Sequence, residues 1–422
     1  MTRQKIIICG AGIAGIAVAF WLSQHHDVTI VERHPDLRST GLQVDLRGHG
    51  IEVLKRMGLE AAFRDVSIKE EGLEFVNNSG KVVAYFPVNK SGQGLQSFTT
   101  DYEIMRGDLI RLLYDNVKDR VQVLFGTTVD SFHQLDHGVE VHLSNGQKNR
   151  YDLLIGADGQ WSHTRKQMLG PGAKDPMHFL GIYAGYFTIP RHIKNGEKYN
   201  ATAYMAPGKR LLFSRRHKPD RIQGYMIGQH DSERVMAARS GGVEEEKSIL
   251  SELFRSAGWR SEEFVTEMQE SEDFYCEHVG VVRLDHWSEG DVVLLGDAAY
   301  CPTATTGMGT SSSLVGAYVL AGEIQDYLSR LSTSKDALPK ALASYEERFR
   351  PFMDTVQYGI EKDKTYWHKM PSGTILLAVF NFFLAVASFF KLDVLASNIL
   401  KEDTGSWKLP NHKGMDLRQE KK

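Results

Sequence analysis

Short apolar runs alternate with segments of helical periodicity in the first part of the chain. Lys5–Cys9 and Asp27–Glu32 are rich in β-branched residues, as buried parallel strands are, and residues 16–24 between them predict a helix. A strand, a turn, a helix and a second strand within about 30 residues form a βαβ unit. The pattern therefore predicts one unit of a parallel sheet at this end of the chain.

Similar patterns recur downstream. Tyr151–Ile155 and Asp291–Leu295 predict two more buried strands, whereas residues 181–229 alternate as antiparallel strands do. Ala337–Phe352 has helical periodicity, and we expect Pro351 to end that helix. The order of these patterns predicts a parallel α/β layer that is interrupted by an antiparallel layer.

Composition adds to this picture only by excluding some classes of protein and of binding site. The chain has 42% hydrophobic and 24% charged residues, which is usual for a folded protein. Its net charge is -3, so no basic surface is expected and no nucleic-acid partner is predicted. The three cysteines and the histidines show no metal-binding spacing. We therefore expect no metal site, and free thiols in a reducing compartment such as the cytoplasm.

A glycine-rich motif directly follows the first predicted strand. Gly10 permits a tight turn, Gly12 lets the backbone approach a pyrophosphate, and Gly15 allows close packing of helix on strand. Free N–H groups at the start of the following helix would bind the phosphates. Glu32 ends the second strand, where a carboxylate binds ribose hydroxyls and disfavours a 2′-phosphate. FAD and NAD both fit this motif.

Two more motifs combine a buried strand, an aspartate and small residues. Asp158-Gly159 follows one strand and Asp297 follows another, and Gly307-Met308-Gly309 opens a helix further on. Ligands of open α/β sheets bind at the carboxyl ends of the strands. Either aspartate alone is also compatible with a simple helix cap. All three motifs together predict a dinucleotide site.

With these motifs the chain resembles the p-hydroxybenzoate hydroxylase-like flavoprotein monooxygenases over roughly residues 3–355. It is most similar to the tetracycline-inactivating and natural-product-tailoring members. The resemblance is carried by Gly10-Ala-Gly-Ile-Ala-Gly15, Val31-Glu-Arg33, Arg106-Gly-Asp-Leu109, Gly156-Ala-Asp-Gly159, Gly296-Asp-Ala-Ala299 and Tyr345-Glu-Glu-Arg-Phe-Arg-Pro351.

The resemblance implies an α/β fold with a Rossmann-like FAD-binding domain, discontinuous in sequence, an inserted antiparallel-sheet substrate domain and a C-terminal helical segment. The expected FAD-binding domain comprises residues 1–70, 100–175 and 276–345, the substrate domain 71–99 and 176–275, and the C-terminal helices and polar tail 346–422.

The resemblance also implies the cofactor-binding residues. Glu32 would bind the adenosine ribose, Asp297 the ribityl or pyrophosphate portion, and the helix after Gly307 the flavin pyrimidine edge. Asp158-Gly159 belongs to a motif linked to both FAD and NAD(P)H, and Arg106 would reach the pyrophosphate region. The full set is Gly10, Gly12, Ala14, Gly15, Glu32, Arg33, Asp45, Arg47, Arg106, Asp158, Gly159, Asp297, Gly307, Met308, Gly309 and Thr310.

The implied activity is an FAD-dependent monooxygenase that uses NADPH or NADH and O2. It would hydroxylate or epoxidise an aromatic, polyketide or terpenoid-like molecule in secondary metabolism. The alternative is a flavin-dependent oxidase or dehydrogenase that inserts no oxygen. Arg210 is a candidate substrate anchor, and Tyr183 and Tyr186 are candidate cavity residues. A solvated charge and ordinary sheet packing are the alternatives for these three.

One position departs from the family pattern. The loop after Gly296-Asp-Ala-Ala299 usually carries a proline three residues before its Gly-x-Gly, where this chain has Ala304. Alanine does not restrict the backbone as proline does. We therefore expect this position to affect the coupling of the oxygen chemistry more than FAD binding.

An uncharged apolar segment, Gly373–Phe390, lies near the C-terminus. At 18 residues it is at the lower limit for a membrane span. The alternatives are a buried helix that packs across both domains and an interfacial helix that dips into a membrane. Membrane association through this segment stays open, as does the oligomeric state. The polar residues from 401 onward are expected to fray.

Overall fold

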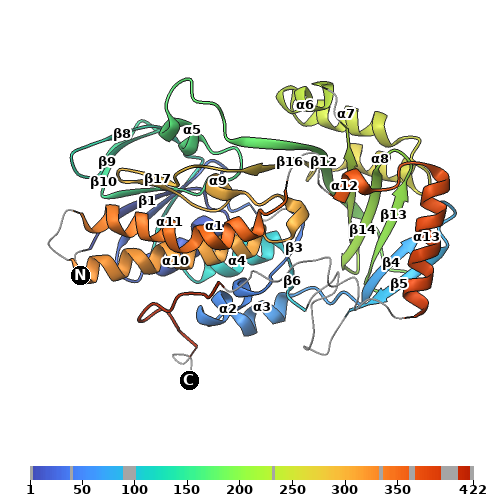
Figure 1. The fold of residues 1–422 in the computed structure, drawn as a ribbon, viewed down its shortest axis with the longest axis horizontal. Helices are drawn as coiled ribbons and strands as arrows, with labels where there is room; N and C mark the ends of the chain where they lie inside the picture. The colour runs from blue at the N-terminus through green and yellow to red at the C-terminus, as the bar shows by residue number, and fades with distance from the viewer. Residues whose placement is uncertain are drawn as a thin grey trace.

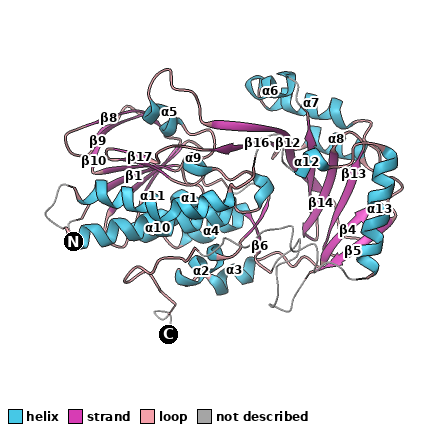
Figure 2. Cartoon of the chain, in the orientation of Figure 1, coloured by secondary structure: helices cyan, strands magenta, loops and turns pink. Residues whose placement is uncertain are grey.

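A computed structural model describes residues 3–38, 41–88, 101–230, 233–331, 336–360, 366–390 and 407–418. It has the mixed α/β fold that the sequence predicts, with two large sheets side by side (Figures 1 and 2). The first sheet has the order β17-β18-β11-β1-β2-β7. Its strands are β1 (Lys5–Cys9), β2 (Asp27–Glu32), β7 (Gln122–Phe125), β11 (Leu153–Gly156), β17 (Ser288–Glu289) and β18 (Val292–Leu294).

The central strands of this sheet run parallel because buried β-branched side chains fill both faces. Ile7 of β1 is level with Leu154 of β11 and Thr29 of β2. A three-stranded antiparallel sheet packs on one face, and helices cover the other. The small sheet consists of β8 (Val129–Gln134), β9 (Val139–Leu143) and β10 (Lys148–Tyr151). The carboxyl ends of the parallel strands therefore meet at one edge, where the motif residues follow.

The helices of this half include a long antiparallel pair. α10 and α11 pack together, and α10 also lies against α1 (Figure 1). The helices are α1 (Ile13–Leu22), α2 (His49–Arg56), α3 (Glu60–Val66), α4 (Arg106–Asp115), α5 (His163–Leu169), α9 (Asp297–Tyr300), α10 (Gly309–Arg330) and α11 (Ala337–Val356), with a 3₁₀ turn, η2 (Ala304–Thr306).

The second sheet has seven strands in the order β16-β12-β15-β14-β13-β4-β5. Helices α6, α7 and α8 pack on one of its faces. The elements are β4 (Gly72–Val76), β5 (Val82–Pro87), β12 (Met177–Pro190), β13 (Asn200–Ala206), β14 (Arg210–Lys218), β15 (Arg221–Gln229), β16 (Tyr275–Val282), α6 (Glu233–Ala238), η1 (Arg239–Gly241), α7 (Val243–Phe254) and α8 (Ser261–Glu270). β16 lies in this sheet because it pairs with β12, although residues from 276 were expected in the FAD-binding domain.

The expectation that Pro351 ends its helix is wrong. α11 continues past this proline to Val356. Phe349 and Phe352 on either side of it are fully buried, and their rings stack with centroids 5.2 Å apart. The burial of these rings outweighs the roughly 3 kcal/mol that an interior proline costs a helix.

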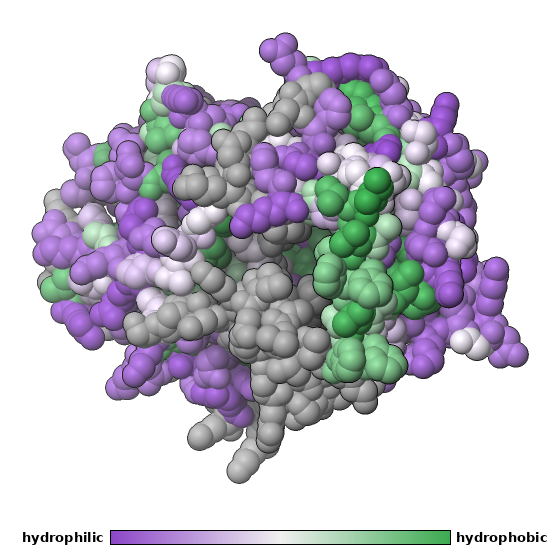
Figure 3. All heavy atoms as spheres, turned by 45° about the vertical axis from the view of Figure 1, so that its right-hand side comes forward, coloured by the Kyte–Doolittle hydropathy of each residue, from purple (hydrophilic) through white to green (hydrophobic). Residues whose placement is uncertain are grey.

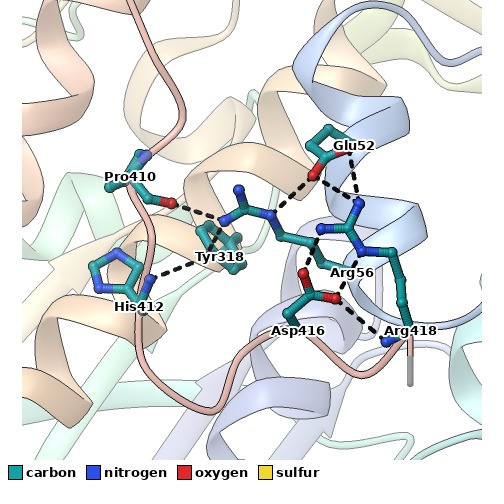
Figure 4. Close-up of polar contacts among 7 residues, drawn as sticks. All are labelled: Glu52, Arg56, Tyr318, Pro410, His412, Asp416 and Arg418. Atoms are coloured by element: carbon teal, nitrogen blue, oxygen red, sulfur yellow. Dashed lines mark hydrogen bonds and ion pairs between the residues drawn. The ribbon is translucent and has the colours of Figure 1, made fainter. Parts of the chain in front are cut away.

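The expectation of a frayed tail is also wrong for residues 407–418, which we call the C-terminal segment. It lies over α2 and α10 (Figure 4). Arg56 of α2 donates to Pro410 O at 2.8 Å, and His412 N donates to the hydroxyl of Tyr318 at 3.3 Å. Met415 is 2% exposed. This segment is ordered because it packs against helices that are distant in sequence. No local sequence pattern predicts such packing.

The apolar segment near the C-terminus forms α13 (Thr374–Phe389), preceded by the short helix α12 (Tyr366–Lys369). α13 packs on β5 at the edge of the second sheet, and only Leu377 of its side chains is buried. The buried helix across both domains is therefore not observed. Most of its large side chains form an apolar ridge on the surface (Figure 3). Within the described ranges, no helix combines the length and the apolar character needed to cross a membrane.

Candidate active site

The glycine-rich turn between β1 and α1 is shaped by close backbone contacts. Gly10 has a φ of +105°, and a Cβ there would lie 2.6 Å from Ala157 O. A Cβ on Gly15 would lie 2.0 Å from Gly10 O. Side chains at these two positions are therefore excluded by the fold itself. Ala14 is also tightly placed, because a Cβ on Gly296 would lie 2.8 Å from its methyl group.

Gly12 faces open space instead. It is the N-cap of α1, and no side chain caps this helix end. The nearest atom to a Cβ at Gly12 would be a guanidinium nitrogen of Arg106, 3.9 Å away. Uncapped N–H groups at a helix start, with an arginine facing them, form an anion-binding site. This geometry fits the pyrophosphate of the predicted FAD.

Two arginines gather around that space. Burial lowers the pKa of the Arg106 guanidinium, and the nearby charge of Arg38 lowers it further. Asp297 and Glu32 are close enough to oppose this shift. Arg106 begins α4, after the short sheet of β3 (Gln43–Asp45) and β6 (Glu103–Met105). The electrostatic repulsion between two neighbouring cations is smallest when an anion lies between them.

The carboxylate of Glu32 is fixed at the end of β2. It accepts hydrogen bonds from Ala11 N at 2.9 Å and from His34 N at 2.8 Å. It therefore lies beside the glycine-rich turn, as a ribose-binding carboxylate requires. Arg33 is exposed.

Asp158 lies at the same edge of the sheet, but its carboxylate is engaged with the protein. It accepts hydrogen bonds from the backbone N–H groups of His163 and Thr164 at 2.8 and 3.0 Å, at the start of α5. This is the geometry of a helix cap. Gly159 has a φ of +82° with open space around it. A cofactor role for this pair stays a prediction.

Asp297 and the start of α10 complete this edge. Asp297 opens α9, and burial raises the pKa of its carboxyl. α10 begins at Gly309 with Met308 as N-cap and no side-chain cap, and Thr310 follows. A Cβ on Gly309 would meet no atom within 4 Å. The structure thus places a second uncapped helix start next to open space.

Asp45 and Arg47 lie beside this second helix start. The two side chains form an ion pair. A Cβ on Gly307 would lie 3.6 Å from Arg47 Nε and 3.9 Å from an Asp45 oxygen. Arg47 N also donates to Ser311 Oγ at 2.8 Å, which joins this loop to α10.

The loop before Gly307 explains the alanine at 304. Thr303 has a φ of +69°, in the left-handed region. A proline restricts the residue before it to extended conformations. Ala304 therefore permits a backbone that proline would disfavour, and its effect on coupling stays a prediction.

Four aromatic rings form a row across the sheet face that is turned away from α7 and α8. We call Phe213, Tyr225, Tyr186 and Tyr275 the aromatic row; they come from β14, β15, β12 and β16. Successive ring centroids are 5.3, 5.3 and 6.2 Å apart. Leu42, next to β3, packs against this row. The aromatic row therefore faces the predicted FAD site.

A half-buried carboxyl lies at the end of the aromatic row. Glu277 accepts a hydrogen bond from the Tyr186 hydroxyl at 3.3 Å. Burial raises the pKa of Glu277 to about 7, and the charge of Asp297 contributes to this rise. A carboxyl with such a pKa is able to exchange a proton near neutral pH.

Tyr183 and Arg210 lie elsewhere. Tyr183 is on the opposite face of β12 from Tyr186, in the core under α7. Arg210 donates to the backbone oxygens of Pro207 and Leu253, at 2.8 and 2.5 Å. Of the three candidate substrate residues, only Tyr186 belongs to the group that faces the predicted FAD site.

Sequence reasoning missed Glu277, Tyr275 and a buried ionic cluster. Arg215 binds Glu70 and Glu103, and so joins β14 to the segments before β4 and at β6. The spacing Tyr275-x-Glu277 in a strand does place both on one face, which was an available signal. The Arg215 cluster joins residues far apart in sequence and left no local signal.

Comparisons with known proteins show the family of the chain. Residues 3–357 match the family model described as "FAD binding domain". The chain is 47% identical to the FAD-dependent monooxygenase asL4 of Sarocladium schorii, over 98% of this chain and 99% of that protein. It is 41% identical to the flavin-dependent monooxygenase eupH of a Phoma species, over 84% and 85% of the two chains.

Solved structures show the same likeness. The crystal structure of the tetracycline destructase Tet(55) has a TM-score of 0.77 and 26% identity, over 97% of this chain and 99% of that one. Klebsiella pneumoniae HpxO, complexed with FAD and uric acid, has a TM-score of 0.69 at 18% identity, over 94% and 97%. The second likeness is one of fold.

Proposed function

The chain belongs to the FAD-binding-domain family and is a flavin-dependent monooxygenase, and from this premise we propose its reaction. It uses NADPH or NADH and O2 to hydroxylate or epoxidise an aromatic, polyketide or terpenoid-like molecule in secondary metabolism. When bound, FAD accepts a hydride from the nicotinamide and delivers oxygen from O2 to the substrate. The protein binds, orients and shields the reactants.

The observation that carries this proposal is the pair of uncapped helix starts at one edge of the sheet. The start of α1 at Gly12, with Arg106 opposite, binds the pyrophosphate. The start of α10 at Gly309 would hold the flavin pyrimidine edge, and its N–H groups would stabilise the negative charge of the reduced form. Glu32 binds the ribose, and Asp297 the ribityl or pyrophosphate portion.

The aromatic row supports the substrate class. Its rings offer an apolar wall for a flat or polycyclic molecule between the second sheet and the FAD site. Glu277 Oε2 holds the Tyr186 hydroxyl, and its carboxyl takes up or returns the proton of a substrate hydroxyl. The wall also excludes water from the reacting atoms.

The experiment is NAD(P)H consumption by the purified yellow holoprotein with a panel of aromatic, polyketide and terpenoid molecules under ¹⁸O2. We expect one panel member to accelerate consumption and to gain one ¹⁸O atom. Accelerated consumption with stoichiometric peroxide and no ¹⁸O in any product would contradict oxygen insertion and favour the oxidase alternative. NADPH and NADH are compared at equal concentration.

We also propose that α13 rests on a lipid surface in the cytoplasm. Ile375, Phe382 and Phe389 are 80%, 64% and 81% exposed. The polar Ser388 instead faces the protein, where its hydroxyl bonds Tyr85 N and O at 3.0 and 2.9 Å. A helix with its apolar side outward has the orientation of an interfacial anchor.

Charge favours lipid over a second copy of the chain. Residues 366–390 contain no aspartate or glutamate, and Lys369 is exposed just before α13. An anionic lipid surface would therefore meet no like charge along this segment. The three free cysteines fit a reducing compartment.

Sedimentation with vesicles of phosphatidylcholine and phosphatidylserine tests this contact. We expect Phe382→Glu with Phe383→Glu to reduce the bound fraction roughly tenfold. Val66→Glu is the matched control, because Val66 is 46% exposed on α3, away from α13. Equal binding by the double variant, or a dimer in ultracentrifugation that only the double variant abolishes, would contradict a lipid contact.

A further inference from the structure

Three side chains with metal-binding atoms meet behind the second sheet, on the side opposite the aromatic row. Cys276 and His278 are two residues apart on β16, so both point to the same face. Glu246 of α7 packs over them. None of the three lies on the face that carries Tyr186 and Glu277, so the proposed reaction leaves them without a role.

The ligand atoms converge. One sulfur, one imidazole nitrogen and one carboxylate oxygen all lie within 4.8 Å of one another. His278 is 4% exposed, and its Nε2 has no hydrogen-bond partner; it lies 3.5 Å from a carboxylate oxygen of Glu246. A buried nitrogen left without a partner is costly unless something else fills that place.

A cavity of atomic size adjoins the three groups. Its volume is about 10 Å³, and its other walls are four aliphatic side chains and Tyr183. This is close to the space that one water molecule or one ion needs. No lysine or arginine lines it among the described residues, and His278 is the ion-pair partner that its wall offers to Glu246.

Electrostatics point the same way. Glu246 is 9% exposed. A divalent cation would balance one thiolate and one carboxylate, and so make a neutral site in an apolar setting.

We propose that Glu246, Cys276 and His278 bind one zinc ion, with water as the fourth ligand. Nitrogen, sulfur and oxygen ligands in a small closed site suit zinc best, whereas calcium and magnesium prefer oxygen alone. Binding releases the thiol proton to solvent. The ion fastens α7 to β16, behind the sheet whose other face carries the aromatic row.

The test is the zinc content of holoprotein expressed with added zinc and then dialysed against a weak chelator. We expect about one zinc per chain in the unaltered protein and at least a tenfold lower content in Cys276→Ser and His278→Gln. His26→Gln is the matched control, because His26 is 1% exposed and its Nε2 also has no partner, but it belongs to no such cluster. Bound FAD reports whether each variant is folded.

Zinc absent from the unaltered protein, or retained in both cluster variants, would overturn the site. If a cluster variant does not fold, X-ray absorption at the zinc edge of the unaltered holoprotein decides. One sulfur ligand among nitrogen and oxygen ligands supports the proposal, and a sphere without sulfur refutes it. None of these readouts depends on turnover, so they stand apart from the proposed reaction.

Discussion

Gly12 allows cofactor binding and folding to be separated. A side chain there would have only the Arg106 guanidinium nearby, at 3.9 Å, so Gly12→Val should fold normally. It would nevertheless fill the space that the pyrophosphate needs. We expect bound FAD to fall roughly tenfold or more, as measured by the ratio of flavin to protein absorbance.

Gly15→Ala provides the contrast. Its Cβ would lie 2.0 Å from Gly10 O, so this smaller change should lower the melting temperature of the FAD-free protein. Gly12→Val should leave that temperature unchanged. Stoichiometric FAD in purified Gly12→Val would refute the assignment of this turn.

Glu277 should make the stability of the FAD-free protein depend on pH. Burial raises its pKa from 4.5 to about 7 in the folded state, so the folded protein holds this proton over a pH range in which the unfolded chain has lost it. The contribution of Glu277 to the free energy of unfolding is therefore fully present at low pH, and it is lost as the pH rises from about 4.5 to about 7.

Glu277→Gln should remove this dependence and stabilise the protein above pH 7 by on the order of 1–2 kcal/mol. Urea unfolding at pH 5 and pH 8 measures the difference. The prediction fails if both proteins lose the same stability between the two pH values.

Most of the predicted cofactor residues belong to motifs whose chemistry is local in sequence, and their roles stay predictions. The glycine-rich turn follows one strand and contains Gly10, Gly12 and Gly15. Their spacing alone determines which of these three positions can carry a side chain. Glu277 could not be assigned in this way, because its pKa depends on burial in the folded protein and on the charge of Asp297. Asp158 shows that a motif predicts a position better than a role, since its carboxylate caps α5.

Among the strands, β12 offers a direct comparison of two faces. Tyr186 and Tyr183 are three residues apart, so they point to opposite sides of the sheet. Tyr186→Phe removes the hydroxyl that binds Glu277, a loss of about 1 kcal/mol, and should raise KM for the substrate roughly fivefold.

Tyr183→Phe is the matched change on the α7 side and should leave KM unaltered. Steady-state kinetics with the substrate found in the ¹⁸O2 panel measure both variants. Equal changes in the two variants would show that the aromatic row does not line the substrate site.

The periodic elements were predictable, but their ends were not. β1, β2 and the antiparallel strands follow from alternation and apolar runs, which burial alone enforces. α11 passes Pro351 because Phe349 and Phe352 are buried, and that burial depends on rings such as Trp407, from a part of the chain with no periodicity of its own.

For the molecule as a whole, the C-terminal segment should be a main support of the first half. Trp407 packs on Phe352 with ring centroids 4.9 Å apart, and Met415 is 2% exposed. Met415→Ala should lower the free energy of unfolding by about 2–5 kcal/mol, as measured by urea denaturation. Lys413→Ala, at an exposed neighbour, should have no effect.

A chain that ends at residue 406 should be destabilised at least as much as Met415→Ala. Unchanged stability in this shortened chain would show that the segment only lies on the surface. The strand order in the sequence predicted a parallel α/β layer interrupted by an antiparallel layer, but not the packing of the C-terminal segment over α2 and α10. Arg56 contacts Pro410, and Tyr318 contacts His412. The residues of each pair are too far apart in sequence for a local pattern to predict these contacts.

The distance in sequence between packed segments also affects how the first half folds during synthesis. β1 emerges from the ribosome first, but its sheet needs β18, whose first residue Val292 follows Lys5 by 287 positions. At 5–20 residues per second this is a wait of roughly 15 to 60 seconds. The residues that pack over α2 and α10 emerge later still, because Trp407 follows Val292 by a further 115 positions. The nascent chain must therefore keep its apolar first strands shielded while these distant segments are still being made.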